Sequence, residues 1–132
     1  MAESRPELRA LRILVIDDEE HIRFALTMCL ETDGHKVTAA GTIEAALEET
    51  ARQAFDLIFL DADMPVMNGF ELCAQLRKMA PHKTTPVIFV TGLTNFEVRA
   101  QSSLAGANDL IAKPFLMMEL AVKALTYLLR PK

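Results

Sequence analysis

Apolar residues in this chain gather in short continuous runs that are separated by longer amphipathic segments. The runs at 13–16, 57–60 and 87–90 are apolar without alternation, which indicates strands covered on both faces. A half-polar run at 37–40 and a weaker run at 110–112 predict two further strands. Strands of this kind are typical of a parallel sheet that is buried between helices.

Amphipathic helices are predicted between these runs and after the last one. The first has apolar residues at helical spacing over 22–30 and stops at Gly34, and the second covers 43–51 with Thr42 as its N-cap. The same spacing recurs in three more segments, near 72–79, 96–107 and 115–129. Because crossovers between parallel strands are right-handed, this order predicts an α/β fold, an open doubly wound (βα)5 sheet with ligands at the carboxyl ends of its strands.

The length of 132 residues fits a single domain with one compact core. We expect a polar lead-in at 1–11 and one folded domain over 12–130, with no second domain in this chain. Cys29 and Cys73 both lie inside helical patterns, so we expect buried free thiols rather than a disulfide or a metal pair.

Composition and charge argue against several classes of protein. With 51% hydrophobic and 24% charged residues, the chain resembles an ordinary soluble globular protein. No stretch approaches the roughly 20 apolar residues of a membrane span, and the N-terminal region lacks the apolar core of a signal peptide. We therefore expect a cytoplasmic protein without membrane insertion. A net charge of −4 and the lack of a basic stripe argue against direct nucleic-acid binding.

Carboxylates follow two of the predicted strands directly. Asp17 and Asp18 come after the first strand and Asp61 after the third, so the three meet at one crevice if those strands are neighbours. Like charges at such short range resist joint ionisation unless a counter-charge is present. Oxygen ligands with room for water suit Mg²⁺. Taken alone, however, the acidic pair is equally consistent with a cap at the positive end of a helix dipole.

Two further strand ends supply groups that complement these carboxylates. Thr91 closes the fourth strand and Lys113 follows the fifth, and a hydroxyl and an ammonium both hydrogen-bond to phosphoryl oxygens. Asp61 is then the natural nucleophile, since carboxylates accept phosphoryl groups as acyl phosphates. Taken singly, Thr91 is better explained as a turn hydroxyl and Lys113 as a solvated surface lysine. The conjunction at four strand ends favours phosphoryl chemistry.

Taken in order, five segments resemble a response-regulator receiver domain, the phosphoacceptor module of two-component signalling. The resemblance covers about residues 12 to 129 and rests on highly specific motifs. These are 13–19 (ILVIDDE), 56–69 (DLIFLDADMPVMNG), 86–92 (PVIFVTG), 106–109 (GAND) and 113–115 (KPF).

The resemblance implies a flavodoxin-like or CheY-like sheet of five strands in the order 2-1-3-4-5, with a cis bond between Lys113 and Pro114. It also implies that Asp61 is the phosphoacceptor and that Thr91 and Lys113 hold the phosphoryl oxygens. By the same resemblance, the Mg²⁺ ligands are Asp18, Asp61 and the backbone carbonyl of Asp63, with Asp17 acting mostly through metal-bound water. Met64, Pro65 and Gly69 shape the loop beyond the acceptor, where we expect glycine to provide a free φ.

A receiver domain is a regulatory phosphoacceptor rather than an enzyme, and its implied phosphohistidine donor is a histidine kinase or a histidine phosphotransfer protein. Phosphorylation is expected to change the surface of the fourth helix, fifth strand and fifth helix. Leu110 departs from the family, which usually has a switch aromatic three residues before the lysine. We expect Thr91 still to move, with Leu110 repacking as a smaller lever or the loop before the fourth helix transmitting the signal. Asp63 and Leu93 occupy positions that tune attack by water.

The last predicted helix is more apolar than one buried face requires. Its narrow polar stripe contains Glu119, Lys123, Thr126 and Arg130. We hypothesise that the apolar remainder contacts a second copy in a homodimer, a kinase or an output domain. The three histidines show no ligand spacing, so we interpret them as surface or turn residues without metal or catalytic roles: His21, His35 and His82.

Two alternative functions compete with the switch. The segment 60–63 resembles the Asp-x-Asp start of haloacid-dehalogenase-type phosphatases, but Pro65 breaks that motif and the chain is short for that fold. The other alternative is a receiver-like scaffold that binds a partner without phosphorylation. Such scaffolds commonly lack the acidic pair or the lysine, and both are present here.

Overall fold

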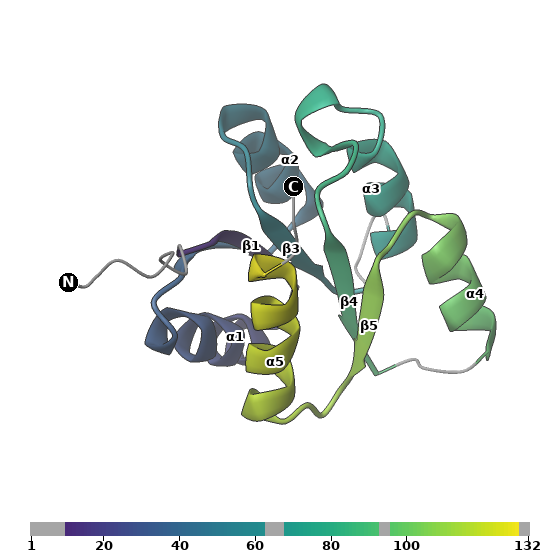
Figure 1. The fold of residues 1–132 in the computed structure, drawn as a ribbon. Coiled ribbons are helices and arrows are strands. Elements are labelled where there is room, and N and C mark those ends of the chain that lie inside the picture. The colour runs from purple at the N-terminus through teal and green to yellow at the C-terminus, as the bar shows by residue number, and fades with distance from the viewer. Residues whose placement is uncertain (1–9, 63–67, 93–95, 130–132) are drawn as a thin grey trace.

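The computed structural model describes residues 10–62, 68–92 and 96–129 (Figure 1). Its five strands are β1 (Arg12–Ile16), β2 (Lys36–Ala40), β3 (Leu57–Leu60), β4 (Val87–Thr91) and β5 (Asp109–Ala112). Its helices are α1 (Glu20–Thr32), α2 (Ile43–Arg52), α3 (Gly69–Leu76), α4 (Phe96–Leu104) and α5 (Met117–Leu128), with a short 3₁₀ turn at Ala80–His82. The strands form one parallel sheet in the order β2-β1-β3-β4-β5, which confirms the predicted doubly wound α/β fold.

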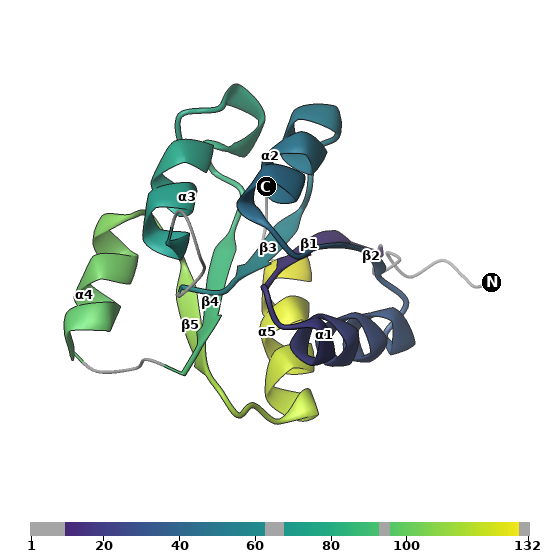
Figure 2. The ribbon, with the colours of Figure 1, turned by 180° about the vertical axis from the view of Figure 1, so that it is seen from behind.

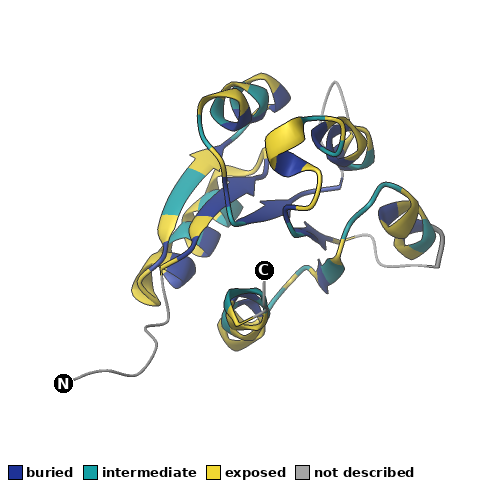
Figure 3. Cartoon of the chain, turned by 45° about the horizontal axis from the view of Figure 1, so that its top comes forward, coloured by how far each residue is buried: buried dark blue, intermediate teal, exposed yellow. Residues whose placement is uncertain are grey.

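Both faces of the sheet are covered, as the continuous apolar runs predicted. Helices α1 and α5 lie against one face, and α2 and α3 lie against the other (Figures 1 and 2). Alternate residues of each strand enter different clusters. The first cluster contains Ile13, Val15, Phe59 and Val90 with Leu26, Leu30 and Leu120, and the second contains Leu14, Ile16, Ile58 and Phe89 with Ala46, Leu72 and Leu76. Figure 3 shows the buried positions gathered in the central strands.

The register of the sheet brings the carboxyl ends of its strands to one edge. Ile16 of β1 lies opposite Leu60 of β3, so the residues after them leave the sheet side by side. On the other half of the sheet, Thr91 pairs with Ala112. The backbone N–H of Lys113 also donates to the carbonyl of Thr91 at 2.8 Å. The predicted strand-end residues that the structure describes therefore lie at one edge of the sheet.

Local sequence signals set several helix ends. The Thr42 hydroxyl accepts from Ala45 N at 3.0 Å, which confirms the predicted N-cap of α2, and Gly34 at φ 89° follows α1. Asn68 and Glu71 form a capping box at the start of α3.

Three helices begin or end at other residues than their apolar patterns suggested. Helix α3 ends at Leu76, before the 3₁₀ turn with its proline, and α4 ends at Leu104, before Gly106 turns the chain at φ 97°. Helix α5 begins at Met117 because Leu116 is still extended.

Of the three histidines interpreted as surface or turn residues, His21 is exposed, His82 lies in the 3₁₀ turn but is buried, and His35 is not a surface residue. His82 is fully buried, with Nε2 3.2 Å from the carbonyl of Thr50 and Nδ1 3.4 Å from Thr85 Oγ1. His35 is buried too, and its Nδ1 accepts from Leu11 N at 3.0 Å. Both rings are buried because main-chain and hydroxyl groups brought by the fold satisfy their nitrogens.

Cys29 and Cys73 are buried free thiols, as predicted. Burial raises the pKa of both, helped at Cys29 by the charge of Asp33 and opposed at Cys73 by that of Arg77. The peptide bond between Lys113 and Pro114 is cis, as the resemblance implied. Across the described ranges, no helix combines the length and apolarity that crossing a bilayer requires.

Candidate functional site

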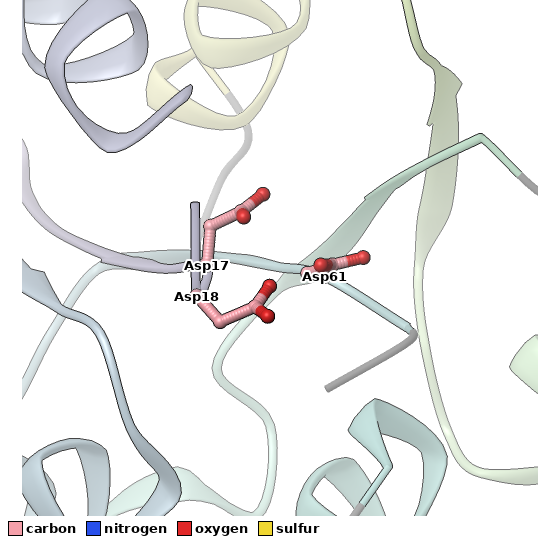
Figure 4. A group of neighbouring side chains, drawn as sticks. All are labelled: Asp17, Asp18 and Asp61. Atoms are coloured by element: carbon pink, nitrogen blue, oxygen red, sulfur yellow. The ribbon is translucent and has the colours of Figure 1, made fainter. Parts of the chain in front are cut away.

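Three carboxylates converge where β1 and β3 end. The N–H of Asp61 donates to the carbonyl of Ile16 at 2.9 Å, which locks the two strand ends together. One oxygen from each of Asp17, Asp18 and Asp61 lies within 4.8 Å of the others. Figure 4 shows the three side chains gathered at these strand ends. The sheet order therefore produces the meeting of carboxylates that the sequence predicted.

The members of this acidic cluster differ in burial. Asp17 is 1% exposed and Asp61 5% exposed, whereas Asp18 is exposed to solvent. Asp17 Oδ1 accepts from Glu19 N at 2.9 Å, just ahead of α1, and Glu19 itself makes no side-chain cap. Asp17 thus serves the helix start as well as the cluster, so the capping alternative and the acidic-site interpretation are compatible.

The Lys113 ammonium enters the cluster from β5. Its Nζ lies 2.8 Å from Asp17 Oδ2, 3.3 Å from Glu19 Oε1 and 3.6 Å from Asp61 Oδ2. Burial alone would lower the pKa of Lys113, but the hydrogen bond to Asp17 and the charge of Asp61 outweigh it and raise that pKa. Lys113 is therefore a fixed cation at neutral pH.

Thr91 is the last residue of β4, at the same edge of the sheet. The residue is 1% exposed, and its carbonyl accepts the backbone N–H of Lys113. Three carboxylates and an ammonium thus meet at the carboxyl edge of a doubly wound sheet, the edge at which such folds bind ligands, and Thr91 ends the neighbouring strand at the same edge.

Comparison with known proteins agrees with this geometry. Residues 13–125 match the response regulator receiver domain family. The chain is a response regulator receiver domain. Over 116 residues it is 40% identical to the transcriptional regulatory protein ResD of Bacillus subtilis, covering 86% of this chain and 47% of ResD. This receiver domain therefore spans about half the length of that relative.

Solved structures share the fold of this receiver domain. The chemotaxis protein CheY4 of Vibrio cholerae superposes with a TM-score of 0.85 at 31% identity, over 92% of this chain and all of that one. The BeF3-activated DrrB receiver domain superposes with a TM-score of 0.84 at 29% identity and the same coverage. The family and the fold give no support to the haloacid-dehalogenase-type alternative.

Glycine is needed at position 69 for a different reason than the free φ that we expected there. Its φ is not positive, in contrast to those of Gly34 and Gly106. A Cβ at this position would instead lie 2.2 Å from the carbonyl oxygen of Asp61 and 2.8 Å from Ala62 Cα. Glycine is therefore required here because the start of α3 approaches the backbone of Asp61 and Ala62 closely, so the reason is steric.

Arg23 belongs to the surroundings of the site, and the sequence analysis missed it. Its Nη1 donates to the carbonyl of Asp17 at 2.9 Å. A Cβ on Gly41 would lie 2.6 Å from the same nitrogen, so the guanidinium occupies the space that the glycine leaves. In the sequence Arg23 looks like one more surface charge on an amphipathic helix, because a donation to a backbone carbonyl leaves no sequence signal.

The remaining predicted residues have different outcomes. Asp63, Met64, Pro65 and Leu93 lie outside the described residues, so the carbonyl ligand and the residues that tune water attack stay predictions. Leu110 is half-buried and packs against the core cluster beneath α2 and α3. An aliphatic side chain thus occupies the usual position of the switch aromatic.

The acidic cluster fits a divalent cation. Three carboxylates face one nearby ammonium, which leaves a formal excess of two negative charges even before Glu19 is counted. The donor set is all oxygen, and exposed Asp18 leaves one side open to water. Mg²⁺ prefers oxygen ligands from a few carboxylates and retains several waters.

Proposed function

We propose that this receiver domain is a phosphorylation-dependent switch that accepts a phosphoryl group on Asp61 in the presence of Mg²⁺. The observation that supports the proposal is the geometry of Lys113, whose ammonium lies between Asp17 and Asp61 at the crevice that Thr91 borders. Family membership supports the same role, because receiver domains are phosphoacceptors of two-component signalling.

Asp18, Asp61 and the backbone carbonyl of Asp63 would hold the metal, and Asp17 would contact it mostly through water. Bound Mg²⁺ supplies positive charge that offsets the carboxylates and the incoming phosphoryl group. Asp17 would orient the crevice through its bonds to Glu19 N and Lys113.

In the transfer itself, a carboxylate oxygen of Asp61 forms a bond to phosphorus as the bond from phosphorus to the donor nitrogen breaks. The donor imidazole leaves with that electron pair, and the product is an aspartyl phosphate. A carboxylate nucleophile has no proton to lose, so no separate general base is needed. The Lys113 ammonium and the Thr91 hydroxyl would hydrogen-bond to the equatorial oxygens, where negative charge accumulates.

The acyl phosphate would bias two arrangements of the loops that follow β3 and β4. A phosphoryl group adds roughly −1.5 to −2 charge, which only differential contacts convert into a population shift. Thr91 would move toward the phosphoryl group, and Leu110 or the loop before α4 would transmit the change to the α4–β5–α5 surface. In this proposal the domain is a regulatory module rather than an enzyme.

Partners follow from the same proposal. The phosphoryl donor would be a histidine kinase or a histidine phosphotransfer protein in the cytoplasm. ResD is a transcriptional regulatory protein about twice as long as this chain, so an output domain or a separate output partner would receive the signal. The acidic surface gives no reason to expect direct contact with nucleic acid.

Intact-mass measurement tests the proposal. The protein is incubated with acetyl phosphate and Mg²⁺, alongside an Asp61→Asn variant and an EDTA control. A gain of about 80 Da, as one phosphoryl group gives, is expected for the native protein alone. If the folded protein gains no mass with any phosphodonor, the switch is refuted and the unphosphorylated scaffold takes its place.

A further inference from the structure

The guanidinium of Arg23 lies beside the start of α1, where the helix dipole disfavours a positive charge. The backbone N–H of Arg23 donates to the carbonyl of Glu19 at 3.0 Å, so the residue closes the first turn of the helix. Among the described residues Arg23 forms no ion pair, and its side chain is half-buried. A cation at this place therefore needs another stabilising contact.

That contact is with the main chain of the acidic cluster. Nη1 of Arg23 donates to the carbonyl of Asp17 at 2.9 Å. Asp17 is 1% exposed, so its carbonyl needs a donor from the protein. A hydrogen bond from a charged donor is stronger than one between neutral groups. The bond therefore joins α1 firmly to the chain just after β1.

The main chain at Asp17 is held from three directions. Its N–H donates to the carbonyl of Ala40 at 3.2 Å, and its Oδ1 accepts from Glu19 N at 2.9 Å. Arg23 supplies the third contact, at the carbonyl. This carbonyl belongs to the same peptide unit as the N–H of Asp18, so Arg23 orients the peptide unit that leads into Asp18.

Gly41, which follows β2, leaves the space for this guanidinium. A Cβ at position 41 would lie 2.6 Å from Nη1 and 2.9 Å from Cζ of Arg23, and the next nearest atom, at 3.4 Å, belongs to Arg23 too. The φ of Gly41 is not positive, unlike those of Gly34 and Gly106, so the backbone conformation does not require glycine. What this position needs is therefore room for Arg23.

Asp18 is the residue that depends on this arrangement. Its side chain is exposed, yet one of its carboxylate oxygens lies within 4.8 Å of oxygens from Asp17 and Asp61 (Figure 4). Packing does not hold an exposed side chain, so the main chain decides where this carboxylate lies. Mg²⁺ tolerates little displacement of a ligand, because it requires near-octahedral oxygens at about 2.0–2.1 Å.

We infer that Arg23 is a positioning residue of the metal site. Its guanidinium holds the peptide unit between Asp17 and Asp18 and so places the Asp18 carboxylate where the cation binds. The inference rests on the proposed function, because it concerns the Mg²⁺ of that same site. The positive charge of Arg23 by itself repels a cation. Loss of the charge and loss of the position therefore have opposite effects on Mg²⁺ affinity.

A magnesium titration of the isotope-labelled full chain, followed through backbone amide NMR shifts, tests the inference without any phosphodonor. Arg23→Ala should raise the dissociation constant of Mg²⁺ about tenfold, as loss of a group that supports metal ligands commonly does. Arg52→Ala is the matched control, because it removes the same charge from an exposed position on α2. It should change the constant by less than about twofold, since solvent and salt screen that charge.

Gly41→Ala tests the same arrangement without changing a charge. The new Cβ should displace the flexible guanidinium and raise the dissociation constant about threefold. In the Arg23→Ala background it should have no further effect, because the three atoms nearest to that Cβ are then absent. In metal-free spectra, Arg23→Ala and Gly41→Ala should both shift the amide signals of Asp18 and Glu19.

The possible results separate the role of Arg23 from the metal site itself. If the native protein binds Mg²⁺ and Arg23→Ala binds it equally or more tightly, the inference is overturned while the metal site stands. An equal effect of Gly41→Ala in both backgrounds would also overturn it, since that effect would not pass through Arg23. No response of the native amide signals to Mg²⁺ would refute the metal site and, with it, the role of Arg23.

Discussion

The ammonium nitrogen of Lys113 lies 2.8 Å from Oδ2 of Asp17, closer than to the acidic oxygen of Asp61 at 3.6 Å. Asp17 is almost fully buried, and the Lys113 side chain retains 15% exposure. Lys113 therefore stabilises a buried carboxylate in addition to any role toward a phosphoryl group. Breaking a buried ion pair on one side leaves an uncompensated charge.

The Lys113–Asp17 pair leads to a double-mutant prediction. Lys113→Met should lower the free energy of unfolding by about 1–3 kcal/mol in metal-free buffer. In the Asp17→Asn background, the loss in the free energy of unfolding caused by Lys113→Met should be smaller by at least about 1 kcal/mol. Urea unfolding of the four proteins measures this coupling. Lys83→Met, an exposed control away from the site, should be additive with Asp17→Asn, and additivity of Lys113→Met would refute the coupling.

Mg²⁺ should stabilise the folded protein through the acidic cluster. A ligand that binds only the folded state at 100 times its dissociation constant adds about 2.7 kcal/mol. Thermal unfolding in MgCl₂ should therefore occur at a higher temperature than in EDTA. Asp18→Asn and Asp61→Asn should lose the difference, while Glu48→Gln on the exposed side of α2 should keep it. Equal melting temperatures of the native protein in the two buffers would contradict a metal site.

Gly69→Ala should be strongly destabilising because its Cβ would overlap the carbonyl oxygen of Asp61 at 2.2 Å. We expect a loss of roughly 2–3 kcal/mol in the free energy of unfolding, as is usual for overpacking. Gly92→Ala is the matched control, since a Cβ there meets nothing within 4 Å, and it should change stability by less than about 0.5 kcal/mol. Similar effects of the two substitutions in urea unfolding would mean that the close approach is relaxed at little cost.

His35 should make the protein less stable as pH falls. Burial lowers the pKa of His35, and the nearby Asp33 carboxylate offsets only part of that effect. Between neutral pH and values below about 6.5, the unfolded chain takes up a proton that the folded imidazole resists, so unfolding becomes more favourable. Protonation would also remove the acceptor that Nδ1 offers to Leu11 N.

The measurement is urea unfolding at about pH 8 and pH 5.5, where one unit of pKa difference corresponds to about 1.4 kcal/mol. His35→Gln should lose less stability over this interval than the native protein does. His21→Gln should lose as much as the native protein, because His21 is exposed. An unchanged pH dependence in His35→Gln would show that the titration of this residue is unimportant.

Much of the fold could be predicted because its strongest signals are local. A continuous apolar run such as Leu57–Leu60 identifies a doubly covered strand, and the Thr42 hydroxyl identifies the start of α2 from one residue type. The strand order came from the family resemblance, since nothing in the runs themselves says which strands are neighbours. Once β1 and β3 are known to be adjacent, Asp17 and Asp61 must lie close together, because each residue comes directly after its strand.

The errors concern residues whose environment comes from distant parts of the chain. His82 is buried because the carbonyl of Thr50, far away in the sequence, reaches its Nε2. Arg23 joins the site through a backbone carbonyl, which has no sequence signature. A glycine looks the same in the sequence whether its position requires a free φ or the absence of a Cβ. Only the neighbours of Gly69 in the folded chain reveal the steric reason.

The hydrogen bond from Gly69 N to the carbonyl of Ala62, at 2.9 Å, joins the two ends of the connection between β3 and α3. Asp61 is thus held on both sides by main-chain contacts, through its own N–H to the carbonyl of Ile16 and through the bond between Ala62 and Gly69. In the proposed switch, the surface beside Asp61 would thus be able to change while the Asp61 carboxylate keeps its place. Partner specificity and phosphoryl chemistry can then evolve along separate stretches of one short sequence.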